Sequence, residues 1–289
     1  MHWSPYIVVA AIWCLAPLLA FAFGTEPIVR FCDKFPLVLR LLLPALFGVP
    51  YVLAGAPWNR VHWLPIYFVL PVIVAVLLWH ARQSDPEQRG DWRDFAVLLL
   101  LGVAVDLRWF EPAWPPHLSV LSKLILLDSG LYGFLVIRQL TKVGFDLRIS
   151  RQDALIGFRE LLWIAPIVIP IGLLLGFLHF RANVPDARSA LLTALVTFLL
   201  IAIPEEIFFR GWIQNLLERR LGGTAALCVT AVIFGLSHFN KRATHFNWRY
   251  VLLATITGIF YGRAWRTQNR VPASAITHAC VDAVWSLWL

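Results

Sequence analysis

An acidic pair and an arginine lie inside a strongly apolar stretch of this chain. Glu205 and Glu206 are adjacent, and Arg210 follows four residues after the second acid, with hydrocarbon side chains on both sides. An ionisable group inside a bilayer costs about 2.5 to 3.5 kcal/mol on insertion scales, so such groups usually face a bundle interior or a wet cavity. A carboxylate held in such a cavity suits general base chemistry. These residues therefore indicate a buried functional site.

Two further polar groups occur in later apolar segments. His238 follows Phe234 by four residues, and Asp282 follows His278 by four residues. Residues four apart share one face of a helix, so Asp282 is placed to hold the His278 ring. Each pattern also has another interpretation. Acids inside a membrane can form ion pairs that hold helices together, or can belong to a transport site. An isolated histidine is more often a hydrogen-bonded core residue. The presence of all three patterns favours an active site.

Helical spacing separates the roles of the two acids. Glu206 and Arg210 are i,i+4 neighbours with the acid first, which is the favourable order for an ion pair on a helix. Glu205 then points to another side without a counter-ion of its own, which suits a general base. Pro204 has no backbone N–H, so it either kinks this helix or begins a new one.

The composition predicts that membrane helices position these residues. Hydrophobic residues make up 59% of the 289, charged residues make up 15%, and the mean hydropathy is +0.70. A spanning helix needs about 20 apolar residues, so we predict an all-α, polytopic transmembrane helix bundle of about eight to ten helices. The segments near 94–109, 223–239 and 249–264 are short for simple crossings. The candidate segments lie near 5–24, 37–55, 63–80, 94–109, 118–137, 160–180, 189–217, 223–239, 249–264 and 271–288.

The depths of the polar residues are compatible with one shared pocket. At 1.5 Å of rise per residue, Glu205 and His238 lie about 18 and 22 Å from the cytoplasmic ends of their segments. His278 and Asp282 lie about 10 and 17 Å from theirs. We therefore expect the three segments to converge.

Basic residues are concentrated in alternate loops, and they predict the topology. By the positive-inside rule these loops face the cytoplasm, which places both termini outside. The net charge of +8 is dispersed over short loops, so it indicates contact with anionic headgroups rather than with nucleic acid. We expect a multi-pass protein of a bacterial cytoplasmic (inner) membrane. The loops in question are 25–36, 81–93, 138–159, 218–222 and 263–270.

The chain is expected to form one integrated membrane domain with two parts. Residues 1–150 provide N-terminal transmembrane helices of unassigned role, and residues 151–289 hold the catalytic region. A polar cytoplasmic loop, 138–160, lies between the two halves. The cysteines are far apart without a C-x-x-C pair, so we expect free thiols and no zinc-cysteine site. These cysteines are Cys14, Cys32, Cys228 and Cys280.

The motifs E-E-x-x-x-R, F-x-x-x-H and H-x-x-x-D/N, in this order, resemble those of a known family. This is the CPBP family of CAAX-processing and bacteriocin-processing glutamic intramembrane proteases, related to the type II CAAX prenyl endopeptidases and the ABI proteins. The resemblance covers roughly 189–289. It includes a G-x-x-x-G spacing at Gly258 and Gly262, which fits a close helix contact.

The resemblance implies metal-free peptide hydrolysis. In that scheme Glu205, helped by His238, activates water, while His278 and residue 282 stabilise the oxyanion. Glu206 and Arg210 would organise the site. The prenyl-protein endopeptidase branch has Asn where this chain has Asp282. Because an ionised carboxylate is a poor oxyanion donor, Asp282 either orients His278 or is itself protonated.

We therefore predict a metal-independent membrane endopeptidase, without a cofactor, that acts on a membrane-associated peptide or protein. One alternative is a non-enzymatic immunity or scaffold protein on the same fold. The other is a zinc protease with Glu205, His238, His278 and Asp282 as ligands, although no H-E-x-x-H motif is present. The substrate classes left open are a prenylated C-terminal peptide, a leader peptide and the membrane-anchored tail of a sorted surface protein.

Overall fold

The computed structural model describes residues 4–54, 58–181, 186–241 and 245–288. Every regular element within these ranges is a helix, and consecutive helical segments join into ten helices there, as the sequence predicted. The chain divides into two compact units, Met1–Thr141 and Lys142–Leu289. Among the described residues, five helices are long and apolar enough to cross a membrane: Pro5–Cys32, Val61–Ser84, Pro116–Ile137, Arg151–Leu174 and Ala187–Leu221.

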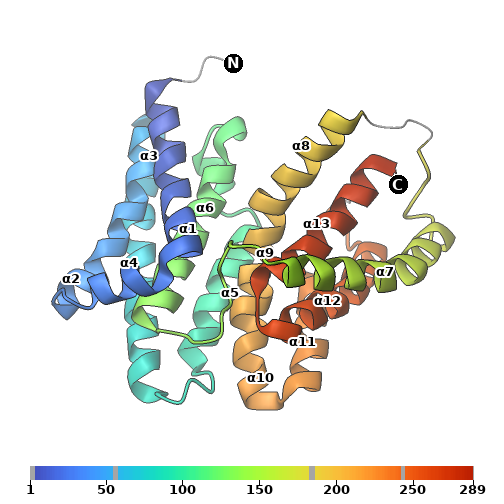
Figure 1. Ribbon diagram of the computed structural model, residues 1–289. Coiled ribbons are helices and arrows are strands. Elements are labelled where there is room, and N and C mark those ends of the chain that lie inside the picture. The colour runs from blue at the N-terminus through green and yellow to red at the C-terminus, as the bar shows by residue number, and fades with distance from the viewer. Residues whose placement is uncertain (1–3, 55–57, 182–185, 242–244, 289) are drawn as a thin grey trace. The chain divides into compact units, whose positions relative to one another are not determined.

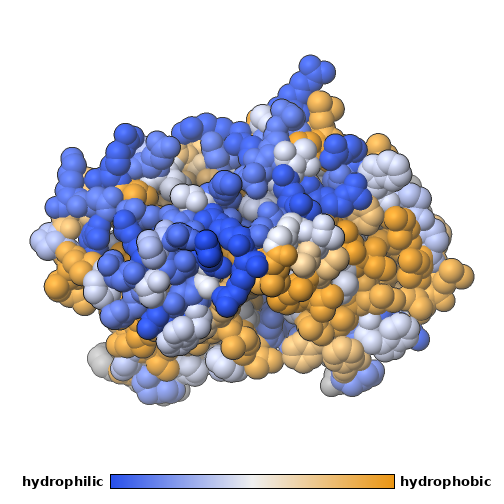
Figure 2. Space-filling view, turned by 90° about the horizontal axis from the view of Figure 1, so that it is seen from below, coloured by the Kyte–Doolittle hydropathy of each residue, from blue (hydrophilic) through white to orange (hydrophobic). Residues whose placement is uncertain are grey.

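The first unit is a helical bundle (Figure 1). Helix α6 (Val120–Leu131) and the π-helical segment η5 (Tyr132–Ile137) after it are almost entirely buried. Apolar residues exposed on the outer helices suit contact with lipid, and Figure 2 shows hydrophobic side chains over broad parts of the face in view. The elements are α1 (Pro5–Cys32), α2 (Leu37–Leu42), η1 (Leu43–Gly48), α3 (Val49–Leu53), η2 (Trp58–Trp63), α4 (Leu64–Ser84), α5 (Trp92–Asp106), η3 (Glu111–Ala113), η4 (Pro116–Leu118), α6 (Val120–Leu131) and η5 (Tyr132–Ile137).

A buried arginine joins three elements of the first unit. Arg138 follows η5, and its Nε and Nη2 donate to the Asp94 carboxylate at 2.9 and 3.0 Å. The same guanidinium donates to Asp85 at the end of α4, through Nη1 to the backbone oxygen at 2.8 Å and through Nη2 to Oδ2 at 2.7 Å. Asp94 also completes the capping box that begins α5 at Asp91. The paired geometry indicates a structural anchor.

The second unit holds every candidate site residue of the sequence, from Glu205 to Asp282. In Figure 1, α8, α9 and α10 follow one another in a single long helix, and α11 and α12 lie side by side. The elements are α7 (Arg151–Leu174), α8 (Ala187–Thr197), η6 (Phe198–Ala202), α9 (Ile203–Glu206), η7 (Ile207–Gln214), α10 (Asn215–Leu221), α11 (Gly223–Leu236), α12 (Trp248–Gln268) and α13 (Val271–Trp288).

Pro204 changes the winding of the long helix without ending it. Its ring crowds the carbonyl four residues earlier and it offers no N–H, so the regular i→i−4 ladder is interrupted there. The chain responds with a π-helical turn, η6, before α9 and a second one, η7, after it. As a result Glu205 and Glu206 lie in the interior of the continuous span Ala187–Leu221.

Helix α7 begins earlier than the sequence analysis placed it. The predicted segment started near 160, but α7 begins at Arg151, where Ser150 and Asp153 form a capping box. Asp153 accepts from Nε and Nη2 of Arg270 at 2.8 and 3.0 Å. The polar residues that resembled a loop are therefore partly helical, because ion pairs to the turn between α12 and α13 satisfy their charges.

Helices α11 and α12 approach closely through glycines, as the G-x-x-x-G spacing predicted. A Cβ on Gly258 would lie 3.1 Å from Cδ1 of Phe234, and a Cβ on Gly262 would overlap the side chains of Leu227 and Gln214. Without a Cβ at these two positions, the backbone carbonyls of α12 are open to side chains from the neighbouring helices.

Candidate active site

Glu206 is fully buried and joins two helices through one oxygen atom. Its Oε1 accepts from Nη1 of Arg210 at 3.0 Å and lies 2.8 Å from Nδ1 of His278. The first contact is the i,i+4 pair that helical spacing predicts. The contact with His278 joins α13 to α9. The Glu206 carboxylate therefore links Arg210, on its own long helix, to His278 on a helix that is distant in the sequence.

Arg210 extends this link to α12. Its Nη2 donates to the backbone oxygen of Gly258 at 2.9 Å, and its guanidinium lies 4.7 Å from the ring centroid of Phe234. One turn later Gln214 donates to the oxygen of Gly262 at 3.3 Å. Polar contacts thus repeat every four residues along both helices, which run in the same direction. This ladder holds η7 against the glycine face of α12.

Glu205 faces away from this ladder. Its side chain is 26% exposed, and its Oε1 lies 3.7 Å from Nζ of Lys241. Its Oε2 lies 3.9 Å from Nε2 of His278 and has no hydrogen-bond partner among the described residues. The expectation that Glu205 has no counter-ion is therefore wrong. Lys241 follows α11 and approaches Glu205 from outside its helix, where helical spacing gives no signal.

The His278 ring is enclosed on every side. Tyr261 stacks on it with ring centroids 4.6 Å apart and an interplanar angle of 15°, and Phe234 meets it edge-on. Because Nδ1 faces Glu206, Nε2 points toward the two remaining acids, with Oδ2 of Asp282 at 3.6 Å. Asp282 lies near the ring, as the i,i+4 spacing predicts, but the carboxylate that accepts a hydrogen bond from Nδ1 of the ring is that of Glu206.

His238 has its tautomer fixed by the backbone. Its Nδ1 lies 2.9 Å from the carbonyl oxygen of Phe234, which can only accept, so Nδ1 carries the proton. The hydroxyl of Ser237 lies 3.1 Å from the same nitrogen. Nε2 is consequently the unprotonated ring nitrogen of neutral His238, and the residue can accept a proton there.

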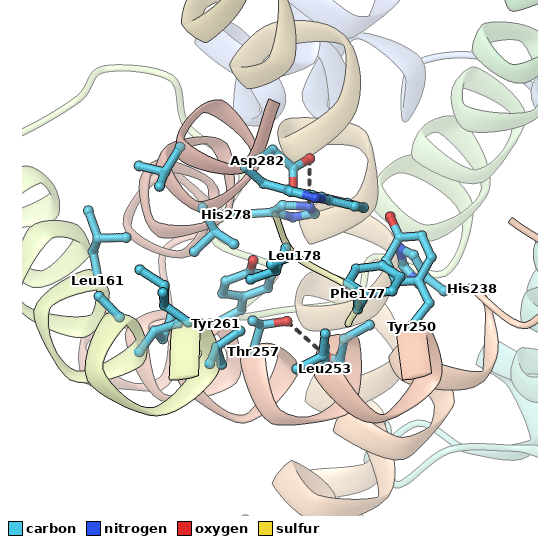
Figure 3. Close-up of a pocket in the computed structure, with 18 of the residues that line it drawn as sticks. Leu161, Phe177, Leu178, His238, Tyr250, Leu253, Thr257, Tyr261, His278 and Asp282 are labelled. Carbon is cyan, nitrogen blue, oxygen red and sulfur yellow. Dashed lines mark hydrogen bonds and ion pairs between the residues drawn. The ribbon is translucent and has the colours of Figure 1, made fainter. Parts of the chain in front are cut away.

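A cavity of about 230 Å³ brings both histidines and Asp282 to one apolar space (Figure 3). His278 and Asp282 lie at one side, and His238 lies near Tyr250 and Phe177. Glu205 does not line the cavity. Its Oε2 lies 3.9 Å from Nε2 of His278, which does line it. The remaining wall is mostly hydrocarbon from α7, α12 and α13, including Leu161, Ile164, Val168, Leu253, Val281 and Trp285.

The structure brings the predicted residues together in one region of the second unit. Glu205, Glu206, Arg210, His278 and Asp282 form a connected cluster. His238 shares the cavity wall with His278 and Asp282.

Sequence reasoning missed two residues of this region. Lys241 could have been noticed as a cation three residues after His238, although this spacing alone is weak evidence of a role at the site. Nothing in the sequence around Tyr261, which lies between Gly258 and Gly262, indicates that its ring stacks on His278.

No group of three or more His, Cys, Asp or Glu side chains in the described ranges is arranged to hold a metal ion. One nitrogen of each site histidine is already engaged, Nδ1 of His238 by a carbonyl and Nδ1 of His278 by Glu206. Nε2 is therefore the nitrogen of each ring that another group can still bind.

Comparison with known families places this cluster inside one matched region. Residues 187–284 match the family model described as type II CAAX prenyl endopeptidase Rce1-like. The match includes every residue of the cluster, from Glu205 to Asp282, and none of the first unit. No curated protein and no solved structure matches the chain.

Proposed function

Since residues 187–284 form a domain of the type II CAAX prenyl endopeptidase Rce1-like family, we propose that this protein is an intramembrane endopeptidase in which Glu205 activates water. The substrate is a peptide or protein associated with the membrane. The proposal includes catalysis without a metal ion or a cofactor.

The observation that carries the proposal is the different environment of two adjacent acids. Glu206 is buried and occupied by Arg210 and His278, so it is suited to an ionised, structural role. Glu205 is partly exposed, and its Oε2 makes no hydrogen bond within the described residues. Oε2 of Glu206 also lacks a hydrogen bond in the described structure, but a base needs access to water as well, and only Glu205 of the two acids is partly exposed.

The proposed reaction uses each group at a stated step. Glu205 accepts a proton as the water oxygen bonds to the scissile carbonyl carbon, and the carbonyl electron pair moves to its oxygen. His278, protonated on both ring nitrogens, keeps its Nδ1–H on Glu206 and donates from Nε2 to this oxyanion. When the C–N bond breaks, the proton held by Glu205 passes to the leaving amine. Nε2 of His238, the nitrogen that its backbone contact leaves available, accepts a hydrogen bond from the same water and helps to orient it.

The apolar cavity supports a lipid-like or strongly hydrophobic substrate segment. A cavity of about 230 Å³ with a hydrocarbon wall excludes most polar side chains, because an unpaired polar group there costs several kcal/mol. The polar edge formed by His238, His278 and Asp282 marks where the peptide bond would lie. A prenylated peptide, a hydrophobic leader and a membrane-anchored tail all remain compatible with this shape.

Purified protein in detergent tests the proposal. The probe is an internally quenched peptide with an S-farnesyl cysteine followed by three residues, assayed beside a leader-like hydrophobic peptide. We expect wild-type protein to cleave at least one of the two, and Glu205→Gln to lower kcat by about 10²- to 10⁴-fold with an unchanged thermal midpoint. Glu87→Gln, the same change at an exposed acid of the first unit, is the matched control. Unimpaired cleavage by Glu205→Gln removes Glu205 from the role of base.

A further inference from the structure

Lys241 is a cation at the site whose side chain makes an ion pair but no hydrogen bond within the described residues. Its Nζ lies 3.7 Å from Oε1 of Glu205, beyond the 2.7 to 3.2 Å of an N–H···O hydrogen bond. An ammonium has three donors, and Nζ makes no hydrogen bond to any described residue. The side chain is 33% exposed, so an incoming group can reach it.

The backbone of Lys241 is fixed from both sides, although the residue lies outside a helix. Its N–H donates to the carbonyl of His238 at 3.2 Å, and its own carbonyl accepts from Nδ2 of Asn247 at 3.1 Å. Asn247 in turn caps α12 by accepting from the N–H of Tyr250. The lysine is therefore held at a constant place, one turn after one site histidine and beside the candidate base.

A simple ion pair does not account for this arrangement. A pair that served only to keep Glu205 ionised would be expected to close to hydrogen-bond distance, as Glu206 and Arg210 do at 3.0 Å. A partly exposed pair at 3.7 Å contributes little, with a median of about 0 to 1 kcal/mol. What the position offers instead is a positive charge with free donors next to the atoms that would attack the substrate.

We propose that Lys241 binds a carboxylate of the substrate on the C-terminal side of the scissile bond. This inference rests on the proposed endopeptidase function and adds a specificity-determining residue to it. The ligand chemistry is a carboxylate, supplied either by the free end of the chain or by an acidic side chain.

Geometry limits how far this carboxylate lies from the scissile bond. A carboxylate hydrogen-bonded to Nζ lies about 2.8 Å from it, and Nζ is 3.7 Å from Glu205. An intervening water and a near-attack contact add about 3 Å each. The total of about 12 Å is the length of three to four residues of extended chain, at 3.3 to 3.6 Å each. The carboxylate therefore belongs to one of the first three residues after the cut.

The test compares cleavage of three matched peptides. The first has a free terminal carboxylate three residues after the cut, the second has a terminal amide, and the third has a terminal amide with Asp among those three residues. We expect wild-type protein to prefer the first peptide or the third over the second by about tenfold to a hundredfold in kcat/KM, mainly through KM. The peptide that is preferred identifies the source of the carboxylate.

Three variants assign the preference to Lys241. Lys241→Met should abolish it, while Lys241→Arg, which keeps the charge, should retain it. Lys142→Met removes the same charge from an exposed lysine of the same unit without an ion pair among the described residues, and it should behave as wild type. An equal preference in Lys241→Met and wild type overturns the inference, as does a wild-type protein that cleaves all three peptides equally.

Binding measurements keep the inference falsifiable if Lys241→Met is inactive. In the Glu205→Gln background, uncleaved peptide with a free carboxylate should bind more tightly than the amide, and this difference should vanish when Lys241→Met is added. An unchanged difference contradicts the role of Lys241. If wild-type protein cleaves none of the peptides, the proposed function itself fails, which is a separate result from a cleaving enzyme that ignores the carboxylate.

Discussion

Oε1 of Glu206 lies 2.8 Å from Nδ1 of His278, across a separation of 72 residues in the sequence. The same atom accepts from Arg210, so one buried oxygen fixes both a guanidinium and an imidazole. The second acid of the pair thus holds the ring through Oε1. Oε2 of both acids makes no hydrogen bond in the described structure, but only Glu205 is partly exposed. This division gives the two adjacent carboxylates different expected responses to the same substitution.

Glu206→Gln should destabilise the protein strongly. The amide cannot neutralise Arg210, and a buried charge that loses its partner typically costs about 3 to 5 kcal/mol. We expect a clear fall in the thermal midpoint of purified protein in detergent. Glu205→Gln is the matched control, since Glu205 and Lys241 are both partly exposed, and its midpoint should stay near wild type. Equal losses in the two variants contradict the structural role of Glu206.

Gly262→Ala should also destabilise the protein, through the contact of α11 with α12. The added methyl overlaps the side chains of Leu227 and Gln214, and overpacking of this kind costs about 1 to 3 kcal/mol. Gly24→Ala is the control, because a Cβ there meets nothing within 4 Å. The comparison is made by thermal unfolding in one detergent. A neutral Gly262→Ala means that the ends of the Leu227 and Gln214 side chains can move aside without loss.

Spacing within one helix could be predicted from the sequence, and contacts between helices could not. The periodicity of Glu206 and Arg210 gives their ion pair directly, and apolar segments of sufficient length give an all-helical fold with the observed number of helices. The hydrogen bond from His278 to Glu206 depends on how α13 is rotated and on its height against α9, which no local pattern encodes.

Boundaries were less predictable where charges are paired across the fold. The residues from Arg151 to Glu160 read as a cytoplasmic loop because they are polar, yet they form the first turns of α7. Glu160 is buried with Arg159 at 2.8 Å and Arg263 at 3.3 Å. A hydropathy scale scores the buried Glu160 as if it faced water, because the scale takes no account of the ion pairs. It therefore does not predict the beginning of a helix that ion pairs stabilise.

Exhaustive chelation should leave activity unchanged. A zinc ion needs three or four ligands at about 2.0 to 2.3 Å, and no group of three His, Cys, Asp or Glu side chains in the described ranges is arranged to hold one. Activity is measured after dialysis against EDTA and 1,10-phenanthroline, together with elemental analysis of the purified protein. One zinc per chain that is lost with activity in His278→Ala would favour the zinc protease instead.

Substitution of Asp282 tests what the carboxylate contributes beside His278. Helical spacing suggested that Asp282 orients the ring, but Glu206 supplies that orientation from another helix, and Asp282 lies 3.6 Å from the opposite nitrogen. Asp282→Asn keeps a polar group at this place and adds N–H donors that can serve an oxyanion. We therefore expect Asp282→Asn to keep kcat within about tenfold of wild type, a smaller loss than removal of a general base or an oxyanion donor. Asp282→Ala, which removes the polar group, should lose more. The rates are measured from pH 5 to 9. A loss above a hundredfold in Asp282→Asn at every pH would show that an ionised acceptor is required there, and the orienting role would then belong to Asp282 after all.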